Sequence, residues 1–202
     1  RRVPFRLRHP FLSAALLGAA LALLGGGAYW LATRVHHGTP KLSARPPTPK
    51  LQQVAICDTC AHDYNPDAVS GPKTQNPNEV GFAIDANPNT AWQTEYYYSG
   101  TLGKAGVGLY LDATPGVAAA EIRIITRLPG WKVQIYATNT QPNPDVFSGW
   151  TLVGSAPLVH STENIPLHPG GTRYRWYLVW INSLPPGAQT VFVNEVTLYA
   201  YK

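Results

Sequence analysis

The sequence has no methionine, only two cysteines and few charged residues, and these shortages limit its fold class. Charged residues make up 13% of the 202 residues, and Lys and Glu, which favour helices, are scarce. By contrast, the chain has 19 Pro, 18 Gly, six Trp and eleven Tyr. Frequent turn residues combined with many aromatic residues favour short strands joined by turns over a helical fold.

Positive charge is unevenly distributed along the chain. Residues 1–50 contain eight Lys or Arg and no acidic residue, which gives a charge of +8. Residues 51–202 contain the other eight basic residues and all eleven acidic ones, which gives −3. A nucleic-acid-binding domain needs its basic residues on the folded domain itself. We therefore expect no nucleic-acid partner.

The two cysteines form a single Cys57-x-x-Cys60 motif. It supplies only two of the four ligands that a structural zinc ion needs, and His62 and Asp63 are the only nearby candidates for the others. A redox pair of this spacing belongs at the start of a helix in a βαβ unit, and no such unit is visible. If the segment is exported, a local disulfide is the simplest interpretation. The motif alone leaves the three interpretations open.

One segment is long and apolar enough to cross a membrane. Residues 11–33 contain no charge, and about 20 apolar residues span a bilayer. Tyr29 and Trp30 stand where interfacial aromatic residues occur, and the four arginines of residues 1–10 place that flank in the cytoplasm. We expect one transmembrane helix and a single-pass protein of the cell membrane, with everything after the helix extracytoplasmic. The alternative is a cleaved secretory signal peptide.

The rest of the chain divides into a linker and one domain. Residues 34–50 contain four prolines and predict a semi-extended linker. Residues 51–202 show alternating strand patterns separated by turn residues, with no sustained helical period and no internal repeat. The fold class that we expect is therefore all-β, an antiparallel β-sandwich behind one transmembrane helix. The predicted strands are Val107–Asp112, Ala120–Thr126, Trp131–Thr138, Thr151–Ser155, Arg173–Ile181 and Val191–Tyr201.

The most informative motif is an apolar-Asp-x-Asn-x-x-Thr-x-Trp pattern at residues 83–92. A second motif, Asn-Glu-Val-Thr-Leu, follows near the C-terminus at residues 194–198. Together with Gly-Val-Gly-Leu-Tyr-Leu-Asp at 106–112, this resembles the discoidin and coagulation-factor C-type domains and their bacterial carbohydrate-binding relatives. The resemblance covers most of residues 62–202 and implies a discoidin-like jelly roll. It is nearest to the membrane-tethered subset found at the C-termini of bacterial Ser/Thr kinases and cell-wall-pathway proteins. Because the sequence does not begin with Met, we expect it to be a processed product or the C-terminal piece of a longer protein.

The resemblance implies one structural calcium ion. Carried over residue by residue, its side-chain ligands would be Asp85, Thr90 and Glu195. Its backbone ligands would be the carbonyl oxygens of Phe82, Asn87, Thr90 and Asn194. Where the family has Gly after the Asp, this chain has Ala86, which would be strained if the position requires positive φ. The alternative interpretation is a turn in which Asp85 and Thr90 only cap backbone amides.

Aromatic residues in predicted loops are the candidates for ligand contact. Sugars suit such residues because their C–H faces pack on rings while their hydroxyls meet polar groups. The predicted ligand-binding residues are Tyr96, Tyr97, Tyr98, Trp131, Trp150, His160 and Arg173. Aromatic residues of β-sandwiches also fill the core, so each ring has that alternative role.

These observations favour a binding module over an enzyme. His160-Ser161-Thr162-Glu163 has the residue types for hydrolysis but no nucleophile elbow, and no kinase motif is present. The expected partner is a cell-wall glycan or another surface carbohydrate, and the chain would then be the sensory tail of a larger protein. The alternative is a protein–protein adhesion domain that binds no glycan.

Overall fold

The computed structural model describes residues 29–30, 48–68 and 73–202. The chain divides into two units, Arg1–Pro47 and Thr48–Lys202, and every strand found in the described residues belongs to the second. The predicted transmembrane helix, apart from Tyr29 and Trp30, lies outside the described residues, as do its basic flank and most of the linker. In the part of the chain that is described, no helix is long and apolar enough to cross a membrane.

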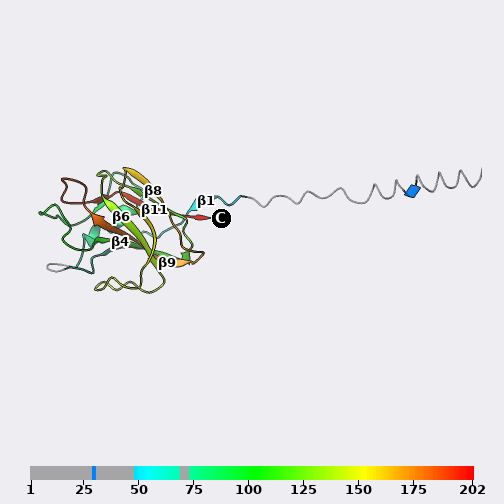
Figure 1. The fold of residues 1–202 in the computed structure, drawn as a ribbon, viewed down its shortest axis with the longest axis horizontal. Helices are drawn as coiled ribbons and strands as arrows, with labels where there is room; N and C mark the ends of the chain where they lie inside the picture. Colours follow the sequence, from blue (N-terminus) through cyan, green and yellow to red (C-terminus); the bar gives the residue numbers. More distant parts are fainter. Residues whose placement is uncertain (1–28, 31–47, 69–72) are drawn as a thin grey trace, which may run out of the picture. The chain divides into compact units, whose positions relative to one another are not determined.

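The second unit consists of short strands connected by turns (Figure 1). In chain order its elements are β1 (Leu51–Gln53), β2 (Ala61–Tyr64), the 3-10 helix η1 (Pro77–Ala83), β3 (Trp92–Gln93), β4 (Val107–Val117), β5 (Glu121–Ile125), β6 (Lys132–Thr138), β7 (Thr151–Ala156), β8 (Thr162–Pro166), β9 (Tyr174–Ser183), β10 (Phe192–Val193) and β11 (Glu195–Tyr201). Within residues 48–68 and 73–202, η1 is the only helix, in agreement with the missing helical period.

The strands form two main antiparallel sheets around one core. The four-stranded sheet has the order β1-β11-β5-β8, the five-stranded sheet has the order β2-β4-β9-β6-β7, and β3 pairs with β10 in a small third sheet. Inward-facing aliphatic residues of both main sheets meet in the core, among them Leu109, Ile124, Ile135, Val179 and Leu198. This confirms the predicted antiparallel β-sandwich. Because the unit contains its own core, we expect residues 48–202 to fold alone.

The alternating sequence of β9 predicts Tyr174, Trp176, Leu178 and Trp180 on one face of the sheet, and residues 177–181 follow this pattern in the structure. Tyr177, Val179 and Ile181 point into the main core. Leu178 and Trp180 point to the other side of the sheet, where they form a second cluster with Tyr64. Tyr174 is the exception, since it packs against the main core next to a bulge in the β4–β9 pairing.

The prediction of one continuous strand at Val191–Tyr201 is wrong, because the structure has two strands there, β10 and β11, separated by Asn194. The side chain of Asn194 donates through Nδ2 to the carbonyl oxygens of Pro88 and Thr90, both at 2.9 Å, and accepts the amide hydrogen of Arg127 through Oδ1. These contacts join two loops to the start of β11. The residue therefore divides β10 from β11 and holds the Asp85–Thr90 loop against the sandwich.

The two ends of the sandwich differ in what they carry. We define the loop end as the end where β4 begins, opposite Ile181 of β9, and where β5 ends next to Glu195. At the other end, which we call the terminus end, Leu51 of β1 pairs with Tyr201 of β11 (Figure 1). The Asp85–Thr90 loop lies at the loop end, because Asn194 holds it beside Glu195. So does the loop that follows Tyr96, because it leads directly into β4.

Candidate functional site

The Asp85–Thr90 loop folds its polar groups around the Asp85 carboxylate. Asp85 Oδ1 accepts the amide hydrogen of Asn87 at 2.9 Å. The Thr90 hydroxyl lies 2.8 Å from Asp85 Oδ2 and 2.7 Å from the carbonyl oxygen of Asn87, and it can donate to one of them at a time. The spacing in the sequence therefore does bring these three residues together.

Ala86 has a φ of 59°. This is the positive φ that was expected to strain an alanine where the resembling family has Gly. A residue with a Cβ in this left-handed region costs about 1–2 kcal/mol. The loop keeps this conformation because Asp85, Thr90 and Asn194 hold it from both sides. The predicted strain is thus present, and the loop geometry is nevertheless retained.

Glu195 faces outward from β11 and is nevertheless only 7% exposed. It lines a cavity of about 240 Å³ together with Ala86 and Pro88 of the loop. Its Oε1 atom is buried and has no hydrogen-bond partner among the described residues. Burial first, and then the neighbouring Asp85 carboxyl, raise the pKa of Glu195 to about 7 from its ordinary 4.5. Partial burial acts to raise the pKa of Asp85 as well, but hydrogen bonds from Thr90, Asn87 and Glu195 outweigh it and lower that pKa.

These residues fit a hard cation. Two adjacent carboxyls repel each other when both are charged, and an unpartnered carboxylate oxygen is costly to bury. No group of three or more His, Cys, Asp and Glu side chains that could hold a metal occurs among the described residues, so a cation here would need hydroxyl and carbonyl oxygens as well. Calcium accepts such mixed oxygen ligands. The structure brings Asp85, Asn87, Thr90 and Glu195 together, whereas the Asn194 side chain braces the loop.

We expect a pH dependence of stability in cation-free protein. The folded domain keeps the Glu195 proton up to about pH 7, whereas the unfolded chain loses it near the ordinary value of 4.5. The stabilisation from this group is therefore complete below about pH 4.5 and is lost as the pH rises through about 7. Thermal unfolding in EDTA should give a midpoint that falls over this interval. Glu195→Gln should flatten that fall, and identical pH profiles of the two proteins would contradict the assignment.

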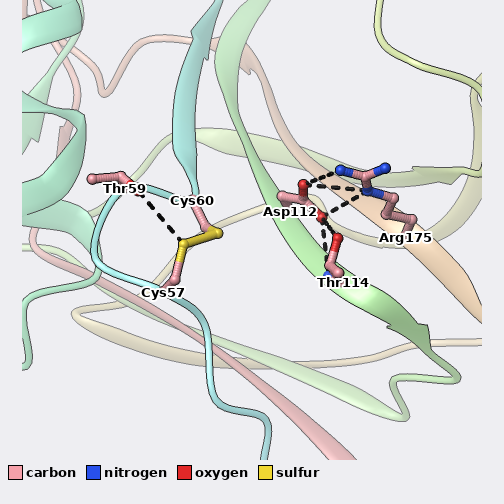
Figure 2. The surroundings of a disulfide bond; sticks show 6 residues. All are labelled: Cys57, Thr59, Cys60, Asp112, Thr114 and Arg175. Carbon is pink, nitrogen blue, oxygen red and sulfur yellow. Dashed lines mark hydrogen bonds and ion pairs between the residues drawn. A yellow bond between two sulfur atoms is a disulfide. The ribbon is translucent and has the colours of Figure 1, made fainter.

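The cysteine motif is a disulfide. Cys57 and Cys60 are bonded with an S–S distance of 2.05 Å, and Figure 2 shows the bond beside the Asp112–Arg175 ion pair. The carbonyl oxygen of Cys60 accepts the amide hydrogen of Asp112 at 2.8 Å, which ties the turn to β4. The expected local disulfide is thus found, and it leaves no thiolate at this position to bind zinc.

The Tyr96–Tyr98 segment presents two rings to solvent and one to the protein. Tyr96 is 54% exposed and Tyr98 is 90% exposed, and their ring centroids lie 4.7 Å apart in an edge-to-face arrangement. Tyr97 points the other way and packs against the main core. Burial, reinforced by the nearby Glu95 charge and opposed by a hydrogen bond to Gln75, raises the pKa of Tyr97 to about 12.

Gln75 fixes the base of this loop, and sequence reasoning missed it. Gln75 is 2% exposed. Its Oε1 accepts the amide hydrogen of Glu95 at 2.9 Å and the Tyr97 hydroxyl at 3.4 Å, and its backbone carbonyl accepts Trp92 Nε1 at 2.6 Å. The Tyr97 amide also donates to the carbonyl oxygen of Gln189 at 2.7 Å. Tyr96 and Tyr98 therefore project from a backbone segment that hydrogen bonds at Glu95 and Tyr97 fix in place.

The other predicted ligand residues do not join the tyrosine pair. Trp131 is a correction, because it is completely buried in the main core and cannot form part of a surface platform. Trp150 is half-buried against the second cluster, formed by Tyr64, Leu178 and Trp180, and donates from Nε1 to the Tyr64 hydroxyl at 3.2 Å. His160 is exposed, with its Nδ1 2.6 Å from Glu163.

Arg173 lies at the opposite end of the sandwich from the tyrosine pair. It donates to the carbonyl oxygen of Gly116 at 2.6 Å, just before β9 begins and where β4 ends. The predicted ligand-binding set therefore does not converge on one surface. Tyr96 and Tyr98 are the two members whose rings are both exposed and adjacent.

Comparison with known proteins gives the fold. No family model matches the chain. Among solved structures, the family 32 carbohydrate-binding module of NanJ from C. perfringens, in complex with galactose, is 16% identical with a TM-score of 0.50, covering 75% of this chain and 100% of that one. A chitosan-binding module of a chitosanase/glucanase from Paenibacillus sp. IK-5 is 12% identical with a TM-score of 0.52, covering 74% and 99%.

A larger protein contains the same fold as one part. The truncated AlyQ, with a family 32 module and an alginate lyase domain, is 12% identical with a TM-score of 0.54. The match covers 76% of this chain but only 34% of that one. The chain thus has the discoidin-like fold of family 32 carbohydrate-binding modules, and the predicted resemblance is confirmed at the level of fold.

Proposed function

We propose that residues 48–202 are a non-catalytic carbohydrate-binding module that recognises a cell-wall glycan or another surface polysaccharide through Tyr96 and Tyr98. The observation that carries the proposal is the exposed, edge-to-face ring pair on a fixed base. Rigid aromatic rings offer the C–H faces of sugars a large contact area at low entropic cost. The binding of galactose by a module of the same fold supports this assignment.

We also propose that the module is extracytoplasmic and is carried by a single membrane-spanning helix at residues 11–33. The apolar character of that segment and the four arginines before it support this orientation. The Cys57–Cys60 disulfide supports it independently, because disulfides persist in oxidising compartments outside the cytoplasm. The proline-rich linker would hold the module away from the membrane.

Retention on insoluble polymers tests the proposed function. Purified residues 48–202 are mixed with insoluble peptidoglycan and with a panel of insoluble polysaccharides, in calcium and in EDTA, and the bound fraction is measured. The proposal predicts retention on at least one glycan. If no polymer retains the domain, the assignment fails, and a protein–protein adhesion domain becomes the better interpretation.

A calcium ion at the Asp85 loop would act structurally. Asp85, Thr90 and Glu195 would hold it together with the Asn87 carbonyl oxygen, and its charge would stabilise two carboxylates that otherwise repel each other. It would lock the loop to the start of β11. The backbone carbonyl oxygens of Phe82, Thr90 and Asn194 complete the proposed ligand set.

We expect calcium to raise the thermal unfolding midpoint of residues 48–202. At a free concentration about 100 times its dissociation constant, a ligand specific for the folded state adds ~2.7 kcal/mol, which is about 5–10 °C for a domain of this size. Asp85→Asn should remove this shift. Glu121→Gln, which changes a carboxylate at the far end of β5, should keep it. An equal calcium shift in Asp85→Asn and in the wild type would contradict the site.

A further inference from the structure

The outer face of the five-stranded sheet carries two shallow hollows that meet at one side chain. One, of about 430 Å³, lies between the segment Gly100–Lys104 and the end of β9. The other, of about 480 Å³, lies over β6 and β7 and is bordered by Gln134 and Ser155. Asn182 lines both hollows. We call residues 96–106 the tyrosine loop and the two hollows together the amide groove, which runs from the tyrosine loop to the edge strand β7.

The floor of the amide groove presents paired amide groups. Asn182 Nδ2 donates to Gln134 Oε1 at 3.1 Å, and the Tyr136 hydroxyl donates to the same oxygen at 3.1 Å. The other halves of the two side-chain amides, Asn182 Oδ1 and the Gln134 NH₂ group, form no hydrogen bond within the described residues. One acceptor and one donor are therefore held side by side. Neighbouring hydroxyls of a sugar ring, each both donor and acceptor, complement such a pair.

The charged residues of the lining are basic. Pro157 is exposed at the border of the groove and offers apolar surface to the C–H face of a sugar ring. Lys104 and Lys132 are the two charged lining residues, and Lys104 donates to Asn65 Oδ1 at 2.5 Å. The lining contains no carboxylate that would select a cationic ligand.

The groove and the tyrosine loop are held in a fixed relation. Gly106, which ends the loop, leaves no room for a Cβ, because a Cβ there would lie 2.4 Å from the Trp180 indole. The end of the loop is thereby packed directly onto β9. The next residue, Val107, pairs with Ile181, which precedes Asn182 in β9. Gly100, the first lining residue of the groove, follows Tyr98 by two positions in the same loop.

We propose that the amide groove is a second sugar subsite, so that the domain binds an extended polysaccharide chain along the sheet face and not only a chain end. This inference rests on the proposed function, since Tyr96 and Tyr98 would hold one part of the same chain. The Asn182–Gln134 pair would hydrogen-bond to a sugar several units further along.

A chain-length series tests the inference. The polysaccharide that best retains the wild-type domain is cut enzymatically into fragments from monosaccharide to octasaccharide, and binding is measured by calorimetry. The affinity of the wild type should rise about tenfold between disaccharide and octasaccharide, as expected for one or two added hydrogen bonds. Asn182→Ala should lose this rise while keeping its affinity for short fragments. Tyr98→Ala should bind more weakly at every length.

The control is Asn164→Ala on β8, which loses one hydrogen bond from Arg123 on the other sheet and should keep the chain-length rise. Thermal unfolding verifies that each variant is folded. An affinity of the wild type that does not depend on length, or a full rise in Asn182→Ala, overturns the inference and leaves the proposed function in place. Failure of the wild type to bind any polysaccharide overturns both.

Discussion

Replacing Tyr96 and Tyr98 together by alanine is expected to abolish retention of the domain on glycan. Each ring provides apolar contact area, and an aromatic contact contributes about 0.5–1.5 kcal/mol beyond the area that it buries. Loss of both rings should therefore weaken binding about 100-fold, which corresponds to ~2.7 kcal/mol. The measurement is the bound fraction in the polymer pull-down, followed by calorimetry with soluble fragments.

The same substitutions should leave the fold intact, because Tyr96 and Tyr98 are exposed and, within the described residues, their ring contact is with each other. Exposed substitutions of this kind change stability by no more than about 0.5 kcal/mol. Tyr201→Ala is the matched control, since Tyr201 is 62% exposed at the terminus end. Undiminished retention of the double variant would remove the tyrosine pair from the site.

Replacing Gly108 by alanine is expected to unfold the domain or nearly so. A Cβ at this position would lie 1.9 Å from the carbonyl oxygen of Val179. Neither backbone can move easily, because Gly108 pairs with Trp180 in β9 and with Tyr64 in β2 at the centre of the sheet. Overpacking against side chains costs about 1–3 kcal/mol, and a clash with paired backbone should cost more. We expect a fall of more than about 10 °C in the unfolding midpoint.

Gly81→Ala is the control for this prediction. A Cβ on Gly81 has its nearest neighbour at 3.9 Å, the carbonyl oxygen of Asp58, which is ordinary van der Waals contact. That variant should unfold within about 0.5 kcal/mol of the wild type. If Gly108→Ala proved equally stable, the close approach of β4 to β9 would be wrong, and with it the register that sets the amide groove beside the tyrosine loop.

Alternating patterns in the sequence predicted the long strands because side-chain alternation is a local property. The pattern from Tyr177 to Ile181 identified the two faces of β9 correctly. The break at Asn194 could not be predicted, because its cause is a set of hydrogen bonds to Pro88, Thr90 and Arg127, which are distant in the sequence. The shortest strands, such as β1 and β3, escaped prediction since they carry too few residues to show alternation.

Prediction of the site succeeded where spacing along the chain decides the geometry. Asp85, Asn87 and Thr90 lie within one turn, so their spacing alone brings them together. Exposure of an aromatic ring, by contrast, depends on packing that the sequence does not display. Trp131 and Tyr98 are both predicted from the sequence to contact ligand, yet Trp131 is completely buried and Tyr98 is 90% exposed. The role of Gln75 depends equally on tertiary contacts and leaves no local signal.

The most direct test of the central claim is an amide-resolved NMR titration of isotope-labelled residues 48–202 with soluble fragments of a retained polysaccharide. Glycan binding through the tyrosine pair predicts concentration-dependent shifts at residues 96–104 and 182–184, with little change at the terminus end around Leu51 and Tyr201. Shifts centred on the terminus end, or none at saturating fragment concentration, would contradict it.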